Sequence, residues 1–218
     1  MANANGQDYS LVINKEGCLV AIFHNWFGRY LEGTNSRLTT DRVYNILTEQ
    51  LPYTRPWNNK FKCYTPRDQF ACGDVGMDSH GYSGVAVNIV DWKTASEPIL
   101  GIMDTAIQIS RDPLLMGITH NAIPNSCLVN YYRNGTDYTG YHEDKELKDP
   151  MNTVYTITLG QPRKFSLKHK KTSERVETLP LSGDLLVMTG KTQDLWKHTI
   201  PKTTTHKTGR ISLTYRVL

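Results

Sequence analysis

The sequence has few cysteines, and their spacing does not fit the usual cysteine-based sites. Its 218 residues include four, Cys18, Cys63, Cys72 and Cys127, and none belongs to a Cys-x-x-Cys pair. Zinc sites and redox motifs are commonly built from such pairs, and small disulfide-bonded proteins carry cysteine at a much higher density. We therefore interpret the four residues as reduced cysteines of an intracellular protein.

Long apolar runs are also absent. The longest covers residues 18–23, whereas a transmembrane helix needs about 20 consecutive apolar residues. Residues 1–10 are polar and lack the apolar stretch of a signal peptide. The sequence therefore predicts neither a membrane span nor a secretory leader, and we expect the protein in the nucleus or the cytoplasm.

Strong charge, internal repeats and low-complexity linkers are missing as well. The net charge is +4, which permits a nucleic-acid partner without requiring one. Hydrophobic residues make up 39% of the chain, enough for a folded core, and 218 residues suit a single domain. We expect one monomeric globular domain.

The periodicity of apolar residues changes along the chain. Residues 39–51 and 96–111 repeat at helical spacing, with Thr40 as the expected cap of the first helix. The second half consists of short β-like runs at residues 126–132, 154–159, 164–168, 175–179, 185–189 and 210–217. Many short strands after a helical start predict a mainly β fold, a jelly-roll barrel with flanking helices.

A dyad of metal-ligand type lies in the second half. His142 and Asp144 are two residues apart, so on a strand they point to the same side, and His198 follows 56 residues after His142. Two histidines and one carboxylate form the triad that holds Fe(II) in non-haem oxygenases. A His-x-Asp dyad arises easily by chance, and its weight here depends on the residues that accompany it.

Two arginines alternate with apolar residues in the last predicted strand. The period of two puts Arg210, Ser212, Thr214 and Arg216 on one face. Two arginines on an inward face are costly without anions or partners, which favours an anion site. Arg210 is suited to the far carboxylate of 2-oxoglutarate, because a guanidinium pairs with a carboxylate through two hydrogen bonds. A plain amphipathic strand is the simpler alternative.

Taken together, these motifs resemble the AlkB family of iron and 2-oxoglutarate dioxygenases, and are similar to the eukaryotic members that repair alkylated DNA and RNA. The resemblance covers about residues 60 to 218. Its most specific parts are the closing Arg-x-Ser-x-Thr-x-Arg strand and an Asn-x-Tyr pair ahead of His-x-Asp. It implies iron ligands at His142, Asp144 and His198, and 2-oxoglutarate contacts at Asn130, Tyr132 and Arg210, supported by Ser212 and Arg216. Many members carry Asn where this chain has Ser212.

The resemblance also implies contacts with a target base. Tyr82 aligns with an aromatic residue that stacks on the flipped base, although a surface-loop tyrosine is the simpler reading. Glu146 falls where the family places an acid that reads the exocyclic amine of the base. Lys145 stands where eukaryotic repair members carry Asp, so the base preference is open. Trp57 and Arg67 are further expected substrate contacts.

A finger and a basic stretch complete the expected substrate surface. Residues 57–60 resemble a turn before a strand at 61–65, where the duplex-acting relative carries an aromatic wedge. This turn is expected to present Asn58 and Asn59, which stack poorly, so we expect a preference for single strands. The basic residues Arg163, Lys164, Lys168, Lys170, Lys171 and Arg175 either contact phosphates or form a solvated hairpin.

The function that the resemblance implies is oxidative removal of N-alkyl groups from bases in DNA or RNA. The reaction uses Fe(II), 2-oxoglutarate and O2 and releases formaldehyde and succinate. Within a single domain spanning 1–218, residues 1–60 form an N-terminal extension with a helix, 60–125 a substrate-recognition region and 126–218 the catalytic core. Two alternatives stay open: a hydroxylase of another substrate, and a catalytically silent nucleic-acid binding module.

Overall fold

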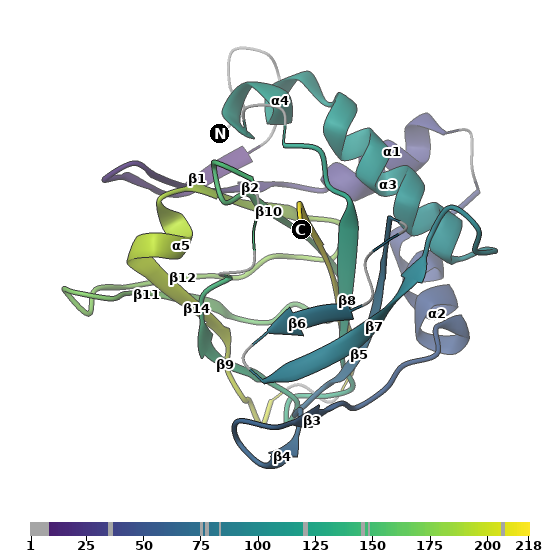
Figure 1. Cartoon of the computed structure of the whole chain (residues 1–218). Coiled ribbons are helices and arrows are strands. Elements are labelled where there is room, and N and C mark those ends of the chain that lie inside the picture. The colour runs from purple at the N-terminus through teal and green to yellow at the C-terminus, as the bar shows by residue number, and fades with distance from the viewer. Residues whose placement is uncertain are drawn as a thin grey trace.

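Two sheets form the body of the computed structural model, which describes residues 9–34, 37–74, 76, 79–82, 84–119, 122–144, 147, 149–205 and 208–218, without the side chains of 79–82. The larger sheet has nine strands within these residues (Figure 1). In spatial order they are β1 (Tyr9–Lys15), β2 (Cys18–Phe23), β13 (Leu185–Gly190), β10 (Val154–Gly160), β15 (Arg210–Arg216), β8 (Ser126–Tyr132), β5 (Asp68–Gly73), β7 (Val85–Asp91) and β6 (Ser79–Tyr82).

The smaller sheet supplies the opposite wall of the barrel. Its strands are, in order, β12 (Arg175–Thr178), β11 (Phe165–His169), β14 (Trp196–Ile200) and β9 (Thr139–His142). A separate hairpin of β3 (Trp57–Asn58) and β4 (Cys63–Tyr64) projects near β7 at the lower edge of Figure 1. The two facing sheets agree with the expected jelly-roll class.

Helices cover the face of the larger sheet that points away from the smaller one (Figure 1). They are α1 (Trp26–Gly33), α2 (Thr40–Gln50), α3 (Ile99–Arg111) and α4 (Pro113–Thr119), while the short α5 (Thr192–Leu195) leads into β14. Their buried faces share one core with the larger sheet, including Phe27, Leu47 and Ile109. None of the helices in the described ranges has the length and apolarity that crossing a bilayer requires.

The alternation of β15 decides what each side of the larger sheet contains. Ile211, Leu213 and Tyr215 belong to the core beneath the helices. The intervening residues, Arg210, Ser212, Thr214 and Arg216, line a pocket between the two sheets. Successive side chains on a strand point to opposite faces, so one strand closes the core and furnishes the pocket. This confirms the sequence prediction that both arginines point inward.

A second core holds the two sheets together beside this pocket. Val20, Leu186 and Met188 of the larger sheet pack with Phe165, Leu167 and Trp196 of the smaller one. Burial of apolar surface contributes about 25 cal/mol per Å² to folding, and this gain offsets the cost of burying the polar groups of the pocket. The pocket therefore occupies one end of an otherwise apolar interior.

The predicted strands of the second half are confirmed to within about one residue, whereas the helical start is partly wrong. Residues 9–23 form β1 and β2, and β2 pairs with β13 along its length. The expected N-terminal extension therefore contributes two strands to the larger sheet as well as α1 and α2. The sequence did not predict β2 because its residues are nearly all buried. The alternation of apolar and polar residues that marks a half-exposed strand is therefore lost.

The helix boundaries also differ slightly from the prediction. The first predicted helix is α2, and its cap is Thr39 rather than Thr40, because the Thr39 side chain accepts the backbone N–H of Arg42. The second predicted helix begins at Ile99 instead of residue 96. Adjacent threonines offer the same chemistry, and only the backbone conformation decides which one caps the helix.

Candidate metal centre and anion pocket

Two histidines and one aspartate meet at the open end of the pocket. His142 ends β9, Asp144 follows two residues later, and His198 lies opposite His142 in β14. One ligand atom from each of the three lies within 4.8 Å of the others, and the imidazole centroids are 4.1 Å apart. The structure therefore brings together the three residues that the sequence predicted, in an arrangement able to hold a metal ion.

Neighbouring groups hold the Asp144 carboxylate and the His142 ring in place. Arg216 Nη2 donates to Asp144 Oδ1 at 2.8 Å, and the Asp144 backbone N–H donates to Gln193 Oε1 at 3.0 Å. His142 Nδ1 lies 3.0 Å from the carbonyl oxygen of Gly140. A carbonyl only accepts, so Nδ1 carries the proton and Nε2 keeps its lone pair for a metal.

Burial keeps both histidines neutral at physiological pH. It lowers the pKa of His142, and it lowers the pKa of His198 to about 3, with the adjacent His142 acting in the same direction. Neutral imidazole is the form that binds a metal ion, because the second nitrogen then presents a lone pair. His198 also packs against the ring of Phe165 at 5.4 Å, which restricts its orientation.

Deeper in the pocket, Arg210 is a buried cation with unused donors. The residue is 1% exposed, and its Nη2 donates to Thr158 Oγ1 at 3.0 Å. Its Nε and Nη1 have no hydrogen-bond partner among the described residues. Burial lowers the pKa of Arg210 to about 10, which leaves it charged at neutral pH. Unsatisfied guanidinium donors in an apolar interior are expensive, so this end of the pocket is suited to an anion.

The other predicted cosubstrate residues line the same pocket. Tyr132 donates to or accepts from Thr139 through the two hydroxyls at 2.7 Å, and the Arg210 guanidinium lies 5.5 Å from the Tyr132 ring centroid. Asn130 Oδ1 accepts from Arg67 Nε at 2.6 Å and Gln69 Nε2 at 2.8 Å. Ser212 pairs in register with Asn130 across β15 and β8. The pocket lining thus includes Asn130, Tyr132, Arg210, Ser212 and Arg216.

The expected substrate contacts are only partly placed. Arg67 lines the pocket and is 5% exposed, held to Asn130 rather than extending toward solvent. Tyr82 ends β6, and its side chain lies outside the described part of the structure, as do Lys145 and Glu146 entirely. Trp57 is 45% exposed on the β3–β4 hairpin and is not part of the pocket lining.

The tip of the β3–β4 finger differs from the prediction. Asn58 belongs to β3 and is buried, with Oδ1 accepting the backbone N–H groups of Lys60 and Phe61. The turn consists of residues 59–62, and Phe61 within it is 64% exposed. The prediction is therefore wrong for Asn58, which is buried and shapes the turn by an Asx-type hydrogen bond, whereas Asn59 is exposed in the turn as expected. The expected strand at 61–65 is also shorter, because residues 61 and 62 belong to the turn and β4 covers only Cys63–Tyr64.

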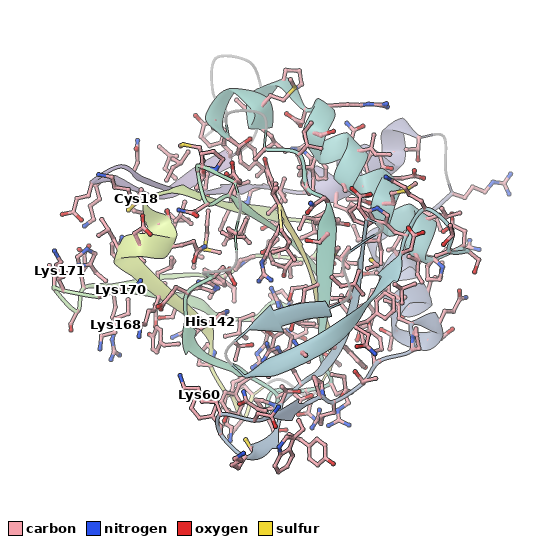
Figure 2. The ribbon with its side chains drawn as sticks, in the orientation of Figure 1. Cys18, Lys60, His142, Lys168, Lys170 and Lys171 are labelled. Carbon is pink, nitrogen blue, oxygen red and sulfur yellow. The ribbon has the colours of Figure 1, made fainter. Side chains whose placement is uncertain are left out.

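The basic stretch divides into one buried and several surface residues. Arg163 is 2% exposed and donates to backbone carbonyls, so it belongs to neither of the expected alternatives. Lys164 directly precedes β11, and the other four lie on the β11–β12 hairpin, where Figure 2 shows Lys168, Lys170 and Lys171 beyond His142. Sequence reasoning also missed Gln193 and Thr158, because a single polar residue beside a site has no recognisable pattern.

Comparison with known proteins agrees with this geometry. The model of the family described as 2OG-Fe(II) oxygenase superfamily matches residues 20–216. The chain therefore belongs to the 2OG-Fe(II) oxygenase superfamily, and to the AlkB family within it. The match begins at β2, which extends the resemblance far upstream of residue 60.

Several relatives are similar over most or part of the chain. "DNA oxidative demethylase ALKBH2" of Arabidopsis thaliana is 28% identical over 201 residues, which is 80% of this chain and 61% of that protein. The human protein of the same name is 31% identical over 160 residues, 69% of this chain and 56% of the relative. "Alpha-ketoglutarate-dependent dioxygenase alkB homolog 3" of Bos taurus is 34% identical over 43% of this chain and 36% of the relative.

The chain spans less than two thirds of the Arabidopsis and human proteins. Among solved structures, that of OsALKBH1 superposes with a TM-score of 0.53 at 16% identity, covering 94% of this chain and 99% of the other. At that identity the likeness concerns the fold alone. The two sheets with flanking helices are thus a fold shared with AlkB-type proteins.

The residues present fit the cofactors of this superfamily, Fe(II) and 2-oxoglutarate, which act with O2. Two neutral histidines and a carboxylate on one side of a metal ion form the facial triad of Fe(II) oxygenases. The unused donors of Arg210 fit a carboxylate deeper in the same pocket. The donor set and the anion end therefore match both groups.

Proposed function

We propose that this protein is an Fe(II)- and 2-oxoglutarate-dependent demethylase that removes N-linked alkyl groups from bases in DNA or RNA. The observation that supports it most directly is one pocket holding a His-Asp-His triad at its open end and the unused donors of buried Arg210 deeper inside. His142, Asp144 and His198 would hold the iron. When bound, the iron centre supplies the oxidising chemistry that hydroxylates the alkyl carbon.

The protein's own residues bind and orient the cosubstrate. Arg210 pairs with the carboxylate of 2-oxoglutarate that is remote from the metal, and Tyr132 and Asn130 complete that end. Arg216 and Ser212 support the site; Arg216 donates to Asp144 Oδ1 and so fixes the orientation of the carboxylate that would hold the metal. Apolar neighbours such as Phe165, Met188 and Ile200 exclude water from the reacting centre.

The overall stoichiometry follows from the proposed substrates. One oxygen atom of O2 enters succinate as 2-oxoglutarate loses carbon dioxide, and the other enters the N-alkyl carbon. For an N-methyl group the product is an N-hydroxymethyl group, whose C–N bond then breaks: the bond's electron pair goes to nitrogen, the hydroxyl proton is released or taken up by nitrogen, and formaldehyde leaves. A base stacked in a duplex cannot reach the pocket, so the target must be unpaired or flipped out.

Basic residues on the outer face of the smaller sheet support a polyanionic partner. On the outer face of the smaller sheet, Lys168 lies directly opposite Arg175 on one side and Lys197 on the other. Like charges facing each other across strands destabilise a sheet, so this row is better explained by phosphates than by folding. Lys197 is partly offset by Glu143 at 3.9 Å. Figure 2 also places Lys60 of the finger beyond His142 on another side.

We propose single strands as the favoured substrate, acted on by a monomer inside the cell. An unpaired base enters without the few kcal/mol that opening a duplex costs. The exposed Phe61 reduces the advantage of single strands over duplexes, because its ring, inserted where the flipped base was, restores part of the lost stacking. Trp57, Tyr82, Lys145 and Glu146 remain proposed base contacts, and residues 60–125 the proposed recognition region.

The test is a product assay that separates the alternatives. Succinate and formaldehyde are measured with Fe(II), using one oligonucleotide with and without a single N-methyl base, in single- and double-stranded form. We expect formaldehyde only with the methylated strand. Succinate that does not respond to any oligonucleotide would indicate a hydroxylase of another substrate, and its complete absence would indicate a silent binding module.

A further inference from the structure

Arg163 is a buried arginine just outside the pocket lining. It lies in the connection between β10 and β11 and is 2% exposed. Its Nη1 donates to the carbonyl of Asn134 at 3.0 Å, and its Nη2 lies within reach of the carbonyls of Gly135, Asp137 and Pro201 at 3.4, 3.0 and 2.7 Å. Burying a cation is costly, and backbone carbonyls only partly compensate for the lost water.

These carbonyls belong to segments that join the strands of the site. Asn134, Gly135 and Asp137 form the connection between β8, which carries the cosubstrate residues, and β9, which ends at His142. Pro201 directly follows β14, the strand of His198. One guanidinium therefore fastens the β8–β9 connection to the end of β14, on the side of β9 away from His142.

Arg163 also lies beside Tyr132, one of the proposed cosubstrate residues. Its guanidinium carbon lies 5.9 Å from the Tyr132 ring centroid, and that of Arg210 lies 5.5 Å from the same centroid. The Tyr132 ring, 3% exposed, is thus shared by two cations, and its hydroxyl bonds with Thr139. A second buried positive charge behind the Tyr132 ring adds to the attraction for a dianion in the pocket, because charges are poorly screened in a protein interior.

We propose that Arg163 is a positioning residue for the distal carboxylate of 2-oxoglutarate, an inference that rests on the proposed function. It holds Tyr132 and the β8–β9 connection so that this carboxylate meets Arg210, and it adds a second positive charge behind the Tyr132 ring. Arg163 does not touch the cosubstrate. Its removal therefore weakens the recognition of the distal carboxylate and leaves the metal end intact.

The experiment measures binding without turnover. Zn(II), which has no redox chemistry, replaces iron, and calorimetry compares 2-oxoglutarate with 2-oxopentanoate, which has the same chain length and lacks the distal carboxylate. For Arg163→Met we expect affinity for 2-oxoglutarate to fall at least tenfold and affinity for 2-oxopentanoate to change less than twofold. Arg42→Met, an exposed arginine on α2, is the matched control and should change neither.

A purely structural role would loosen the whole pocket and weaken both ligands alike, and that outcome overturns the inference. So does an unchanged affinity for 2-oxoglutarate. If Arg163→Met does not fold, Arg163→Lys is measured instead, because it retains the charge but cannot span the four carbonyls. The affinity of this variant should fall at least threefold for 2-oxoglutarate and less than twofold for 2-oxopentanoate. Wild-type protein that does not prefer 2-oxoglutarate would contradict the proposed function, and this inference with it.

The steady-state counterpart uses the iron enzyme. Arg163→Met should raise the KM for 2-oxoglutarate at least tenfold while kcat at saturating 2-oxoglutarate, and the KM for the methylated oligonucleotide, change less than threefold. Combining Arg163→Met with Tyr132→Leu should cost less than the product of the two single effects, because both act on one contact. Independent, multiplicative effects would show that Arg163 does not act through Tyr132.

Discussion

In the pocket between the two sheets, Arg210 and Asp144 are 1% and 4% exposed, whereas on the β3–β4 finger Phe61 and Tyr64 are each 64% exposed. The buried groups are constrained from all sides, and each polar atom placed there costs stability unless a partner or ligand satisfies it. The exposed aromatics are free of that constraint, so the fold does not require them. We infer that the buried pocket serves the chemistry common to all substrates, and that the finger serves the choice among them.

The largest expected effect concerns the metal ligands of the pocket. His142→Ala, Asp144→Ala or His198→Ala each removes one of three protein ligands, and we expect 2-oxoglutarate turnover to fall by roughly a hundredfold or more, whatever the oligonucleotide. Succinate formation with Fe(II) is the measurement. His24→Ala, which alters a partly exposed histidine in another part of the chain, is the control. Retention of more than a few per cent of activity would contradict the triad assignment.

The next prediction concerns the free energy of unfolding, which should fall at low pH because His198 is buried in its neutral form. His198 has a pKa of about 3 in the folded protein and 6.5 ordinarily, so between these values the unfolded chain binds a proton that the folded chain does not. Stability is therefore full above pH 6.5 and is lost as the pH falls toward 3. For metal-free protein we expect about 2 kcal/mol less stability at pH 5.0 than at pH 7.5.

Urea unfolding at both pH values, in the presence of a chelator, measures this loss. His198→Asn keeps a polar side chain that does not titrate, so its stability should change by correspondingly less over the same interval. An identical pH dependence in the variant and the wild type would show that His198 is not the group responsible.

Arg210→Lys tests the buried end at the cosubstrate. Lysine supplies a point charge without the planar pair of donors, so we expect the KM for 2-oxoglutarate to rise about tenfold for single- and double-stranded substrates alike. The initial rate as a function of 2-oxoglutarate concentration gives this value, with Arg42→Lys as the control. An unchanged KM would move the cosubstrate anchor elsewhere, with Arg216 the next candidate.

The smallest effect should separate the finger from the pocket. Phe61→Ala removes the exposed ring, and we expect demethylation of a duplex to fall about threefold while that of the matching single strand stays within experimental error. Phe61→Tyr keeps the ring and should behave as wild type. An equal loss on both substrates would mean that the finger also supports the pocket. A loss on the duplex seen with Trp57→Ala but not Phe61→Ala would identify Trp57 as the stacking residue.

The two regions also differ in how well the sequence predicted them. The strand of Arg210 and Arg216 was placed correctly, because strict alternation over seven residues leaves one consistent arrangement of its faces. The turn of the finger was predicted at residues 57–60 and lies at 59–62, since these few residues are too close together for any period to tell strand from turn. Asparagine is common at the tips of turns, yet Asn58 is buried here and shapes the turn through its side chain.

By itself the sequence determined the alternation of β15, the jelly-roll class and the chemistry of the triad, because side-chain type and a period of two are local properties. Tertiary structure alone decided that His142 lies opposite His198 and that β1 and β2 join the larger sheet. It also decided that Arg163, unlike the basic residues near it in the sequence, is buried and donates to backbone carbonyls. These facts depend on strand pairing between segments far apart in the chain. No local pattern encodes that pairing, since it follows from which buried surfaces and hydrogen-bonding groups satisfy one another best.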